Sequence, residues 1–330
     1  MKLNLVDAIS GFYTVKALDA LHSSGILTEL VSGKSVSQVC DERKIDHLFV
    51  SYLLRYLTIA TDVVVNPNGG EHFLLGENYS LNDAAHLVDL YLGAFGPCSH
   101  NLQATLVDPT KGEQYVNATR HALAFGERSG SASPYFSSII EEIEVSFLLD
   151  LGCGGGGMLK DLASSNSKFE GLGVDANADV ISFASRTVPE SCGDRVQFKC
   201  GDFMRLNLVL SEEEIAKVQA ISFRSAANGF FGWDEKRSFS ALIGQLKRMF
   251  PGKLLFIGDY VPVLDLKSDQ SEVPFRTLIH DFAQVISSQG LPPSSHEEWI
   301  GLYKMLDVSV IGLYGYGDEH IKHFIHILRL

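Results

Sequence analysis

The sequence lacks paired cysteines, long apolar runs and clusters of basic residues. Its five cysteines form no CxxC pair and no cluster with histidine at zinc-ligand spacing, which argues against a disulfide framework and a structural metal. No run approaches the roughly 18 apolar residues of a membrane span, and the amino terminus lacks a signal-peptide core, so we expect a cytoplasmic protein with no membrane partner. The 27 basic residues are fewer than the 40 acidic ones and are scattered, which argues against nucleic acid as a partner.

The first 80 residues have the pattern of a small helical module. Apolar residues fall at helical spacing, and in DVVVNPNGGEHFLL an Asn-Pro-Asn-Gly-Gly turn joins two short strands. Helices followed by such a hairpin predict a winged helix over residues 1–80. Its last helix, HLFVSYLLRYLTIA, is nearly all apolar, and such a face is typical of a protein interface rather than of a DNA-reading helix. We therefore expect a dimerisation module and a homodimer.

Two further segments follow this module. Residues 81–144 are predicted to form a helical linker that covers the active site, with a loop at GERSGSASP. From residue 145 to 330, short apolar strands such as FLLDLG, FEGLGVD and QAISFR alternate with amphipathic helices. Strands interleaved with helices of this length predict a parallel sheet covered on both faces. The expected fold is α/β, with a Rossmann-like sheet behind a mainly helical amino-terminal domain.

The first strand of the predicted sheet runs into five glycines in six positions, broken only by Cys153. Gly152, Gly154 and Gly157 satisfy the spacing GxGxxG, in which absent side chains let the backbone approach a ligand. Gly156 lies in the same turn. Ligands of parallel sheets bind beyond the carboxyl ends of the strands, usually at this first turn. The turn therefore predicts a ligand site.

Acids near this turn indicate which ligand. Asp175 in GLGVDAN lies about 20 residues on and suits the hydroxyls of a ribose. Asp202 in KCGDFM suits the adenine amino group, with Phe203 packed on the ring. Asp150 precedes the first glycine by two residues, where it would repel a pyrophosphate but attract the sulfonium and ammonium groups of S-adenosylmethionine. We expect S-adenosylmethionine, and an NAD-dependent oxidoreductase is the remote alternative.

In this order and spacing, DLGCGGG, GVDAN and CGDF resemble the three cofactor motifs of class I S-adenosylmethionine-dependent methyltransferases. With the winged helix, the chain is similar to the O-methyltransferase family that dimerises through such a domain. Its ending, VSVIGLYGYG and HFIHILRL, resembles that family's reversed final strand. In that family a His-Asp-Trp stretch supplies the histidine that deprotonates the substrate hydroxyl. Here Trp233 fits, but Phe231 occupies the histidine's place, and a phenyl ring accepts no proton.

Three explanations of the missing base stay open. The chain could methylate an amine, a carboxylate or an acidic hydroxyl, in specialised metabolism. A base could instead come from elsewhere, with His121, or with His280 and Asp281 in RTLIHDFAQ, which resembles the family's pocket-lining helix. Or the α-amine of S-adenosylmethionine could attack its own γ-carbon, expel methylthioadenosine and close azetidine-2-carboxylic acid, as the azetidine-2-carboxylate synthases of this fold do.

The remaining candidates would surround the methionine end of the ligand. A ring face attracts a sulfonium by roughly 0.5–2 kcal/mol. The aromatic side chains that could enclose the sulfonium are those of Tyr115, Tyr135, Phe136, Phe230, Phe231 and Trp233. The resemblance places Tyr115 as acceptor or orienter of the amine and Asn117 as a hydrogen-bond partner of the tail. Arg224, at a strand end, suits a carboxylate of the cofactor or of a substrate.

Overall fold

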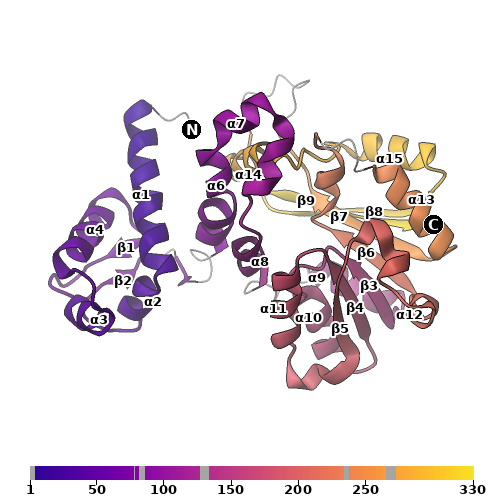
Figure 1. Ribbon diagram of the computed structural model, residues 1–330, viewed down its shortest axis with the longest axis horizontal. Helices are drawn as coiled ribbons and strands as arrows, with labels where there is room; N and C mark the ends of the chain where they lie inside the picture. The colour runs from indigo at the N-terminus through magenta and orange to yellow at the C-terminus, as the bar shows by residue number, and fades with distance from the viewer. Residues whose placement is uncertain (1–3, 78, 82–85, 127–133, 234–237, 265–272) are drawn as a thin grey trace. The chain divides into compact units, whose positions relative to one another are not determined.

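The computed structural model describes residues 4–77, 79–81, 86–126, 134–233, 238–264 and 273–330. The chain separates into two compact units, Met1–Gly96 and Pro97–Leu330 (Figure 1). The three-part division at residues 80 and 144 stays a prediction. Most of the expected loop GERSGSASP, namely 127–133, lies outside the described residues.

The amino-terminal unit is mainly helical and contains a small hairpin. Its elements are α1 (Leu5–Ser23), α2 (Ile26–Val31), α3 (Val36–Arg43), α4 (His47–Ala60), β1 (Val64–Val65), β2 (Leu74–Leu75) and the π-helical η1 (Val88–Ala94). β1 and β2 pair antiparallel, as DVVVNPNGGEHFLL predicts. Ser35 begins α3 in a capping box with Gln38, and the Asp46 side chain accepts the Phe49 N–H at the start of α4. Local sequence signals thus set the helix starts.

Several large apolar side chains of this unit lie outside its core. α4 turns Val50, Leu54 and Leu57 inward. The side chains that remain exposed on α1 and α4 include those of Leu5, Val6, Phe12, Tyr13, Leu48, Phe49, Tyr52 and Ile59. We call this set the α1/α4 apolar surface. Its size is unusual for a surface that faces only water.

The second unit is built on a seven-stranded sheet in the order β5-β4-β3-β6-β7-β9-β8 (Figure 1). The strands are β3 (Phe147–Leu151), β4 (Glu170–Asp175), β5 (Val196–Cys200), β6 (Ala220–Arg224), β7 (Leu254–Tyr260), β8 (Ser309–Gly317) and β9 (Lys322–Arg329). β3 to β7 run parallel, and β9 runs antiparallel between β7 and β8. The predicted α/β fold, with its reversed final strand, is therefore confirmed.

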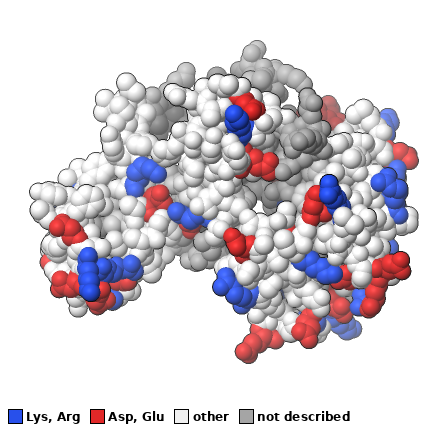
Figure 2. Space-filling model, viewed as in Figure 1, with Lys and Arg blue, Asp and Glu red and all other residues white. Residues whose placement is uncertain are grey.

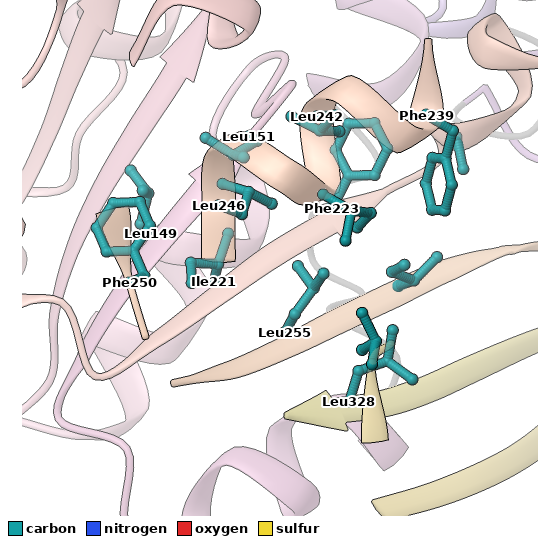
Figure 3. Close-up of a cluster of buried hydrophobic side chains, with 14 of the residues drawn as sticks. Leu149, Leu151, Ile221, Phe223, Phe239, Leu242, Leu246, Phe250, Leu255 and Leu328 are labelled. Carbon is teal, nitrogen blue, oxygen red and sulfur yellow. The ribbon is translucent and has the colours of Figure 1, made fainter. Parts of the chain in front are cut away.

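Helices cover both faces of this sheet. The described helices from residue 96 onward are α6 (Gly96–His100), α7 (Leu102–Val107), η2 (Pro109–Tyr115), α8 (Ala118–Gly126), α9 (Pro134–Glu142), α10 (Gly157–Ser165), α11 (Ala178–Arg186), η3 (Glu190–Arg195), η4 (Phe203–Leu208), α12 (Glu212–Lys217), η5 (Ala227–Phe230), α13 (Phe239–Met249), α14 (Phe275–Ile286) and α15 (His296–Met305), and among them α10 and α13 pack on opposite faces of the sheet. Leu149 of β3 and Leu246 of α13 belong to one core cluster (Figure 3). The neighbouring residue Leu148 belongs to a second cluster with Phe136 of α9 and Leu159 of α10. Successive residues of β3 thus face opposite layers, which explains its continuous apolar run.

Charged side chains of both signs are visible on one face of the molecule. On the face that Figure 2 shows, acidic and basic side chains are scattered, and no single basic patch gathers there. In the described part of the chain, no helix is both long and apolar enough to cross a membrane.

Candidate functional site

The turn after β3 requires glycine at its positions for different reasons. Gly152, Gly154 and Gly156 all have positive φ, at 70°, 52° and 73°, which disfavours any other residue. A Cβ on Gly156 would lie 2.1 Å from the ring of Phe198, so this glycine also permits close packing. A Cβ on Gly154 would meet nothing within 4 Å. The turn therefore packs tightly at Gly156 and presents bare backbone to open space at Gly154.

Asp175, at the end of β4, holds this turn in place. One of its carboxylate oxygens accepts the N–H of Gly154 at 3.1 Å, and the other accepts the N–H of Asn177 at 2.9 Å. The Gly152 N–H donates to the carbonyl of Val174 at 2.8 Å. The structure thus brings the first two predicted motifs together at the carboxyl ends of β3 and β4.

Asp150 is a buried carboxyl group one residue before the end of β3. It is 5% exposed, and its register partner in β6 is Ser222, so the two side chains share one face of the sheet. Burial raises the pKa of Asp150 to about 7, against the lowering effects of Arg224 and Ser222, while Asp175 adds to the increase. A nearby cation would favour the charged form of such a group.

Lys160 supports the turn, although nothing in the sequence analysis singles it out. Its side chain is buried, and its Nζ donates to the Gly155 carbonyl at 2.7 Å and to Thr187 Oγ1 at 2.6 Å. Burial lowers its pKa to about 8. The available signal was its position between Leu159 and Leu162, because a lysine between core residues of a helix is rarely left without a partner.

The third predicted motif forms a cap and a packing contact. Asp202 is exposed and accepts the Met204 N–H at 2.8 Å at the start of η4. The half-buried ring of Phe203 lies 5.6 Å from the ring of Phe223 and 6.1 Å from that of Phe230. The roles proposed for Asp202 and Phe203 at an adenine stay predictions.

The predicted aromatic enclosure is partly core. The ring of Phe231 lies 5.8 Å from that of Phe239 and 5.5 Å from that of Trp299, and both partners are buried. Phe136 is fully buried, whereas Trp233 is 42% exposed. Phe231 therefore contributes to packing, and its expected place beside the reacting group stays a prediction.

Tyr115 and Asn117 lie on or beside η2, a segment that is tied to the end of α14. Tyr115 is half-buried at the end of η2, and the exposed Asn117 accepts the Arg120 N–H at 3.1 Å at the start of α8. The Gly112 N–H of η2 donates to Ser288 Oγ at 2.7 Å. Asn117 is thus held by a local hydrogen bond and η2 by a long-range one, and the roles of Tyr115 and Asn117 at the ligand stay predictions.

His280 and Asp281 lie side by side in α14 and point to different partners. The His280 ring lies 4.5 Å from the ring of Tyr260, and its Nε2 lies 3.2 Å from the Gln284 amide nitrogen. One oxygen of Asp281 accepts the N–H groups of Val263 and Leu264 at 2.7 and 2.6 Å. Asp281 therefore fixes the segment after β7.

Asp259 is a second buried carboxyl group, which the sequence analysis does not predict. Asp259 is 4% exposed near the end of β7, and its Oδ1 accepts the Tyr260 N–H at 2.9 Å. Burial raises its pKa to about 7, while the N–H groups of Ala227 and Asn228 act in the opposite direction. The signal was the pair Gly-Asp at a strand end, which KLLFIGDY shares with VQFKCGDF.

The predicted residues that converge are the glycine turn, Asp150, Asp175 and Arg224, at the carboxyl ends of β3, β4 and β6. A surface hollow of about 300 Å³ in the amino-terminal unit, with Arg55 and Glu71 in its lining, contains none of them. No group of three or more metal-ligating side chains occurs among the residues that the structure describes. The site therefore consists of the backbone of the glycine turn, the carboxyl groups of Asp150 and Asp175, and the guanidinium of Arg224.

Comparisons with known proteins match this arrangement. Residues 148–239 fit a family described as a methyltransferase domain. Among curated proteins, methyltransferase ungE' of Aspergillus campestris (strain IBT 28561) is 26% identical over 167 residues, which is 48% of this chain and 46% of that protein. The match thus spans about half the length of this curated relative.

Two solved structures are similar over nearly the whole chain. The mitomycin 7-O-methyltransferase MmcR has a TM-score of 0.70 at 14% identity and covers 99% of this chain and 97% of its own. Human N-acetylserotonin methyltransferase, solved in complex with S-adenosylmethionine, has a TM-score of 0.66 at 16% identity and covers 98% and 96%. At these identities the likeness establishes the fold.

Proposed function

We propose that this chain, which has the fold of class I S-adenosylmethionine-dependent methyltransferases, binds S-adenosylmethionine at the glycine turn and transfers its methyl group to a small molecule. The observation that carries the proposal is the buried Asp150 beside a bare turn. A sulfonium or ammonium favours the ionised form of a buried carboxyl group, whereas a pyrophosphate would be repelled by it. Asp175, at the next strand end, suits the ribose hydroxyls.

Ligand binding tests this proposal. We expect S-adenosylmethionine, and not NAD, to raise the melting temperature, because stabilisation grows as RT ln(1 + [L]/Kd) for a ligand of the folded state. Asp150→Asn should keep the fold and weaken binding, while Glu212→Gln, on the exposed first turn of α12, should bind as the wild type does. A response to NAD alone would overturn the assignment.

The acceptor that the site suits best needs no strong base. The ring of Phe231, in the place of the family's histidine, packs on Phe239 and Trp299 and supplies no proton acceptor. A carboxylate or an acidic hydroxyl is already deprotonated near neutral pH, and an amine becomes a nucleophile once it loses its own proton to solvent, so we propose one of these as the methyl acceptor. The methyl-transfer rate on a phenol, by contrast, should rise with pH in proportion to the phenolate fraction and level off only above the phenol's own pKa, which a pH–rate profile measures.

A second candidate function is ring closure of S-adenosylmethionine, and the raised pKa of Asp150 favours it. The α-ammonium would lose one proton to a group such as Asp150, whose pKa is about 7. The amine nitrogen then forms a bond to the γ-carbon as the bond from that carbon to sulfur breaks. The products are methylthioadenosine, azetidine-2-carboxylic acid and one released proton.

Incubation with S-adenosylmethionine alone separates the two candidates. Methyl transfer predicts an unchanged nucleoside until an acceptor is added, and then S-adenosylhomocysteine. Ring closure predicts methylthioadenosine at a catalytic rate with no second substrate. An Asp150→Asn variant that still binds the ligand should then lose the second activity.

We also propose that the chain is a homodimer through its amino-terminal unit. The α1/α4 apolar surface supports this, because a second copy would bury the same exposed side chains on both partners. Phe49→Asp and Tyr52→Asp should shift the mass in light scattering from dimer to monomer. Leu208→Asp, in the other unit and 74% exposed, is the matched control and should leave the mass unchanged.

A further inference from the structure

Arg224 is a half-buried guanidinium whose contacts are almost entirely apolar. Its Cζ lies 4.9 Å from the centre of the Phe136 ring, and its Nη1 lies 3.0 Å from the Met158 sulfur. Its stem crosses Gly258, where an added Cβ would lie 3.1 Å from Arg224 Cγ. A thioether is a weak acceptor for a group that has five N–H donors. The absence of a side chain at Gly258 thus leaves room for the stem of Arg224. The weak bond to the Met158 sulfur is the one side-chain hydrogen bond of this guanidinium among the described residues.

No carboxylate among the described residues forms an ion pair with this arginine. Among the described residues, none of the carboxylate oxygens lies within the 4.0 Å of an ion pair with Arg224, although Asp150 is near enough for its charge to be felt. A partly buried guanidinium is most stable when a carboxylate takes two of its N–H groups side by side. Its surroundings therefore suit an anion from outside the chain.

A buried histidine near this end of the sheet is affected by the charge of Arg224. His323 of β9 is the register partner of Tyr260, so it lies at the carboxyl end of β7. Arg224 and Arg276 of α14 both act on His323, whose pKa falls to about 4 through burial first and these positive charges next. The ring of Tyr316 stacks on it at 5.2 Å. The carboxylate of Asp318 acts on His323 in the opposite direction, and of the two arginines Arg224 is the one whose side-chain contacts are known.

Arg224 lies on the same sheet face as the buried acid Asp150. Asp150 is the register partner of Ser222, and Arg224 lies two residues beyond Ser222, so all three side chains point to one side. The acid at β3 and the arginine at β6 therefore present opposite charges on neighbouring strands. That pair of charges complements an α-amino acid, whose ammonium and carboxylate are joined through one carbon.

We propose that Arg224 forms a carboxylate-binding subsite at the carboxyl end of β6. The proposal rests on the proposed function only for the identity of the ligand. The carboxylate belongs either to the methionine moiety of S-adenosylmethionine or to the second molecule that reacts with it. In both cases the subsite fixes the orientation of the reacting groups at the edge of the sheet.

The first arm of the test addresses the cofactor. The full chain is titrated with S-adenosylmethionine and with decarboxylated S-adenosylmethionine, which lacks only the carboxylate. If the cofactor fills the subsite, the wild type prefers the former about tenfold to a hundredfold, as for a hydrogen bond to a charged group. Arg224→Met should reduce that preference, and Arg224→Lys should keep part of it. Arg205→Met, at an exposed arginine of η4, is the control.

The second arm addresses a carboxylate from another molecule. Acetate, with acetamide as its uncharged counterpart, is titrated into the ligand-free protein and into the protein saturated with S-adenosylhomocysteine, and its NMR line broadening is followed. Acetate binding that persists in the saturated protein and is lost in Arg224→Met assigns the subsite to a second substrate. Binding only to the ligand-free protein assigns it to the cofactor.

The proposal is overturned if Arg224→Met, with a wild-type melting temperature, changes neither the cofactor preference nor acetate binding. Failure of the proposed function looks different. In that case S-adenosylmethionine does not bind the wild type at all, and the acetate arm on the ligand-free protein still decides whether the subsite exists.

Discussion

The glycine turn allows two substitutions that separate folding from ligand binding. Gly154 and Gly156 both have left-handed φ, so alanine at either position costs about 1–2 kcal/mol of backbone strain. At Gly156 the new methyl group would also lie 2.1 and 2.3 Å from two ring carbons of Phe198. Overpacking of this kind costs about 1–3 kcal/mol more. We therefore expect the free energy of unfolding to fall by about 2–5 kcal/mol in Gly156→Ala and by about 1–2 kcal/mol in Gly154→Ala.

Ligand affinity should follow a different order. The methyl group of Gly154→Ala would point into open space, where S-adenosylmethionine is proposed to approach the backbone. A methyl group in that position holds the ligand away from the turn, so we expect its Kd to rise at least about tenfold, as for a loss of roughly 1.4 kcal/mol. Gly154→Ala should therefore weaken ligand binding while costing less stability than Gly156→Ala.

Urea unfolding followed by circular dichroism gives the stabilities, and calorimetric titration with S-adenosylmethionine gives the affinities. The dependence on urea should be the same for both variants, because neither changes the surface exposed on unfolding. Equal midpoints for the two variants would refute the close contact of Gly156 with Phe198. Wild-type affinity in Gly154→Ala would refute the turn as the ligand's contact point.

Three further predictions concern buried polar groups. Burial lowers the pKa of His326 to about 3, so as the pH is lowered from about 6.5 the unfolded chain takes up this proton before the folded chain does. Stability should therefore fall as the pH is lowered through that window, by up to about 1.4 kcal/mol per pH unit. Urea curves should show a smaller slope in His326→Asn. The pKa of Asp150 is about 7 in the folded chain, so its contribution to stability is present below about pH 3.8 and is lost as the pH rises to 7. Asp150→Asn should therefore be more stable than the wild type at pH 8. In calorimetry the same variant should bind S-adenosylmethionine less tightly. Asn228 donates to Gln284 at 2.6 Å, so Asn228→Ala should cost about 1–3 kcal/mol in a urea titration, and a cost near zero would show that water replaces the amide.

Much of the sheet can be predicted from the sequence because its strands carry local signals. Phe147–Leu151 is a short apolar run that stops at glycines, and its burial on both faces leaves no polar alternation to confuse the pattern. The acids at strand ends follow the same logic, since Asp175 and Asp202 both stand where an apolar run meets a turn. The glycine turn, with its left-handed φ angles, is equally local.

The contacts that decide which side chain faces the ligand are not local. The ring of Phe231 packs on Trp299, a residue of α15 far along the chain, so its spacing from Trp233 could not reveal that it belongs to the core. Lys160 reads as an ordinary helix residue, yet its partner Thr187 is 27 residues away. The surroundings of Arg224 likewise come from α9, α10 and β7, and only the folded chain brings them together.

The place of β9 has a consequence for the order in which the sheet is assembled. β8 is paired only with β9 within the described sheet, and β9 alone joins it to β7. β8 therefore cannot dock when it leaves the ribosome but must wait until the later strand inserts. Until then the edge of β7 is unprotected, and such an edge pairs readily with other chains. Substitutions that slow the insertion of β9 should cause aggregation during synthesis even where the finished protein tolerates them.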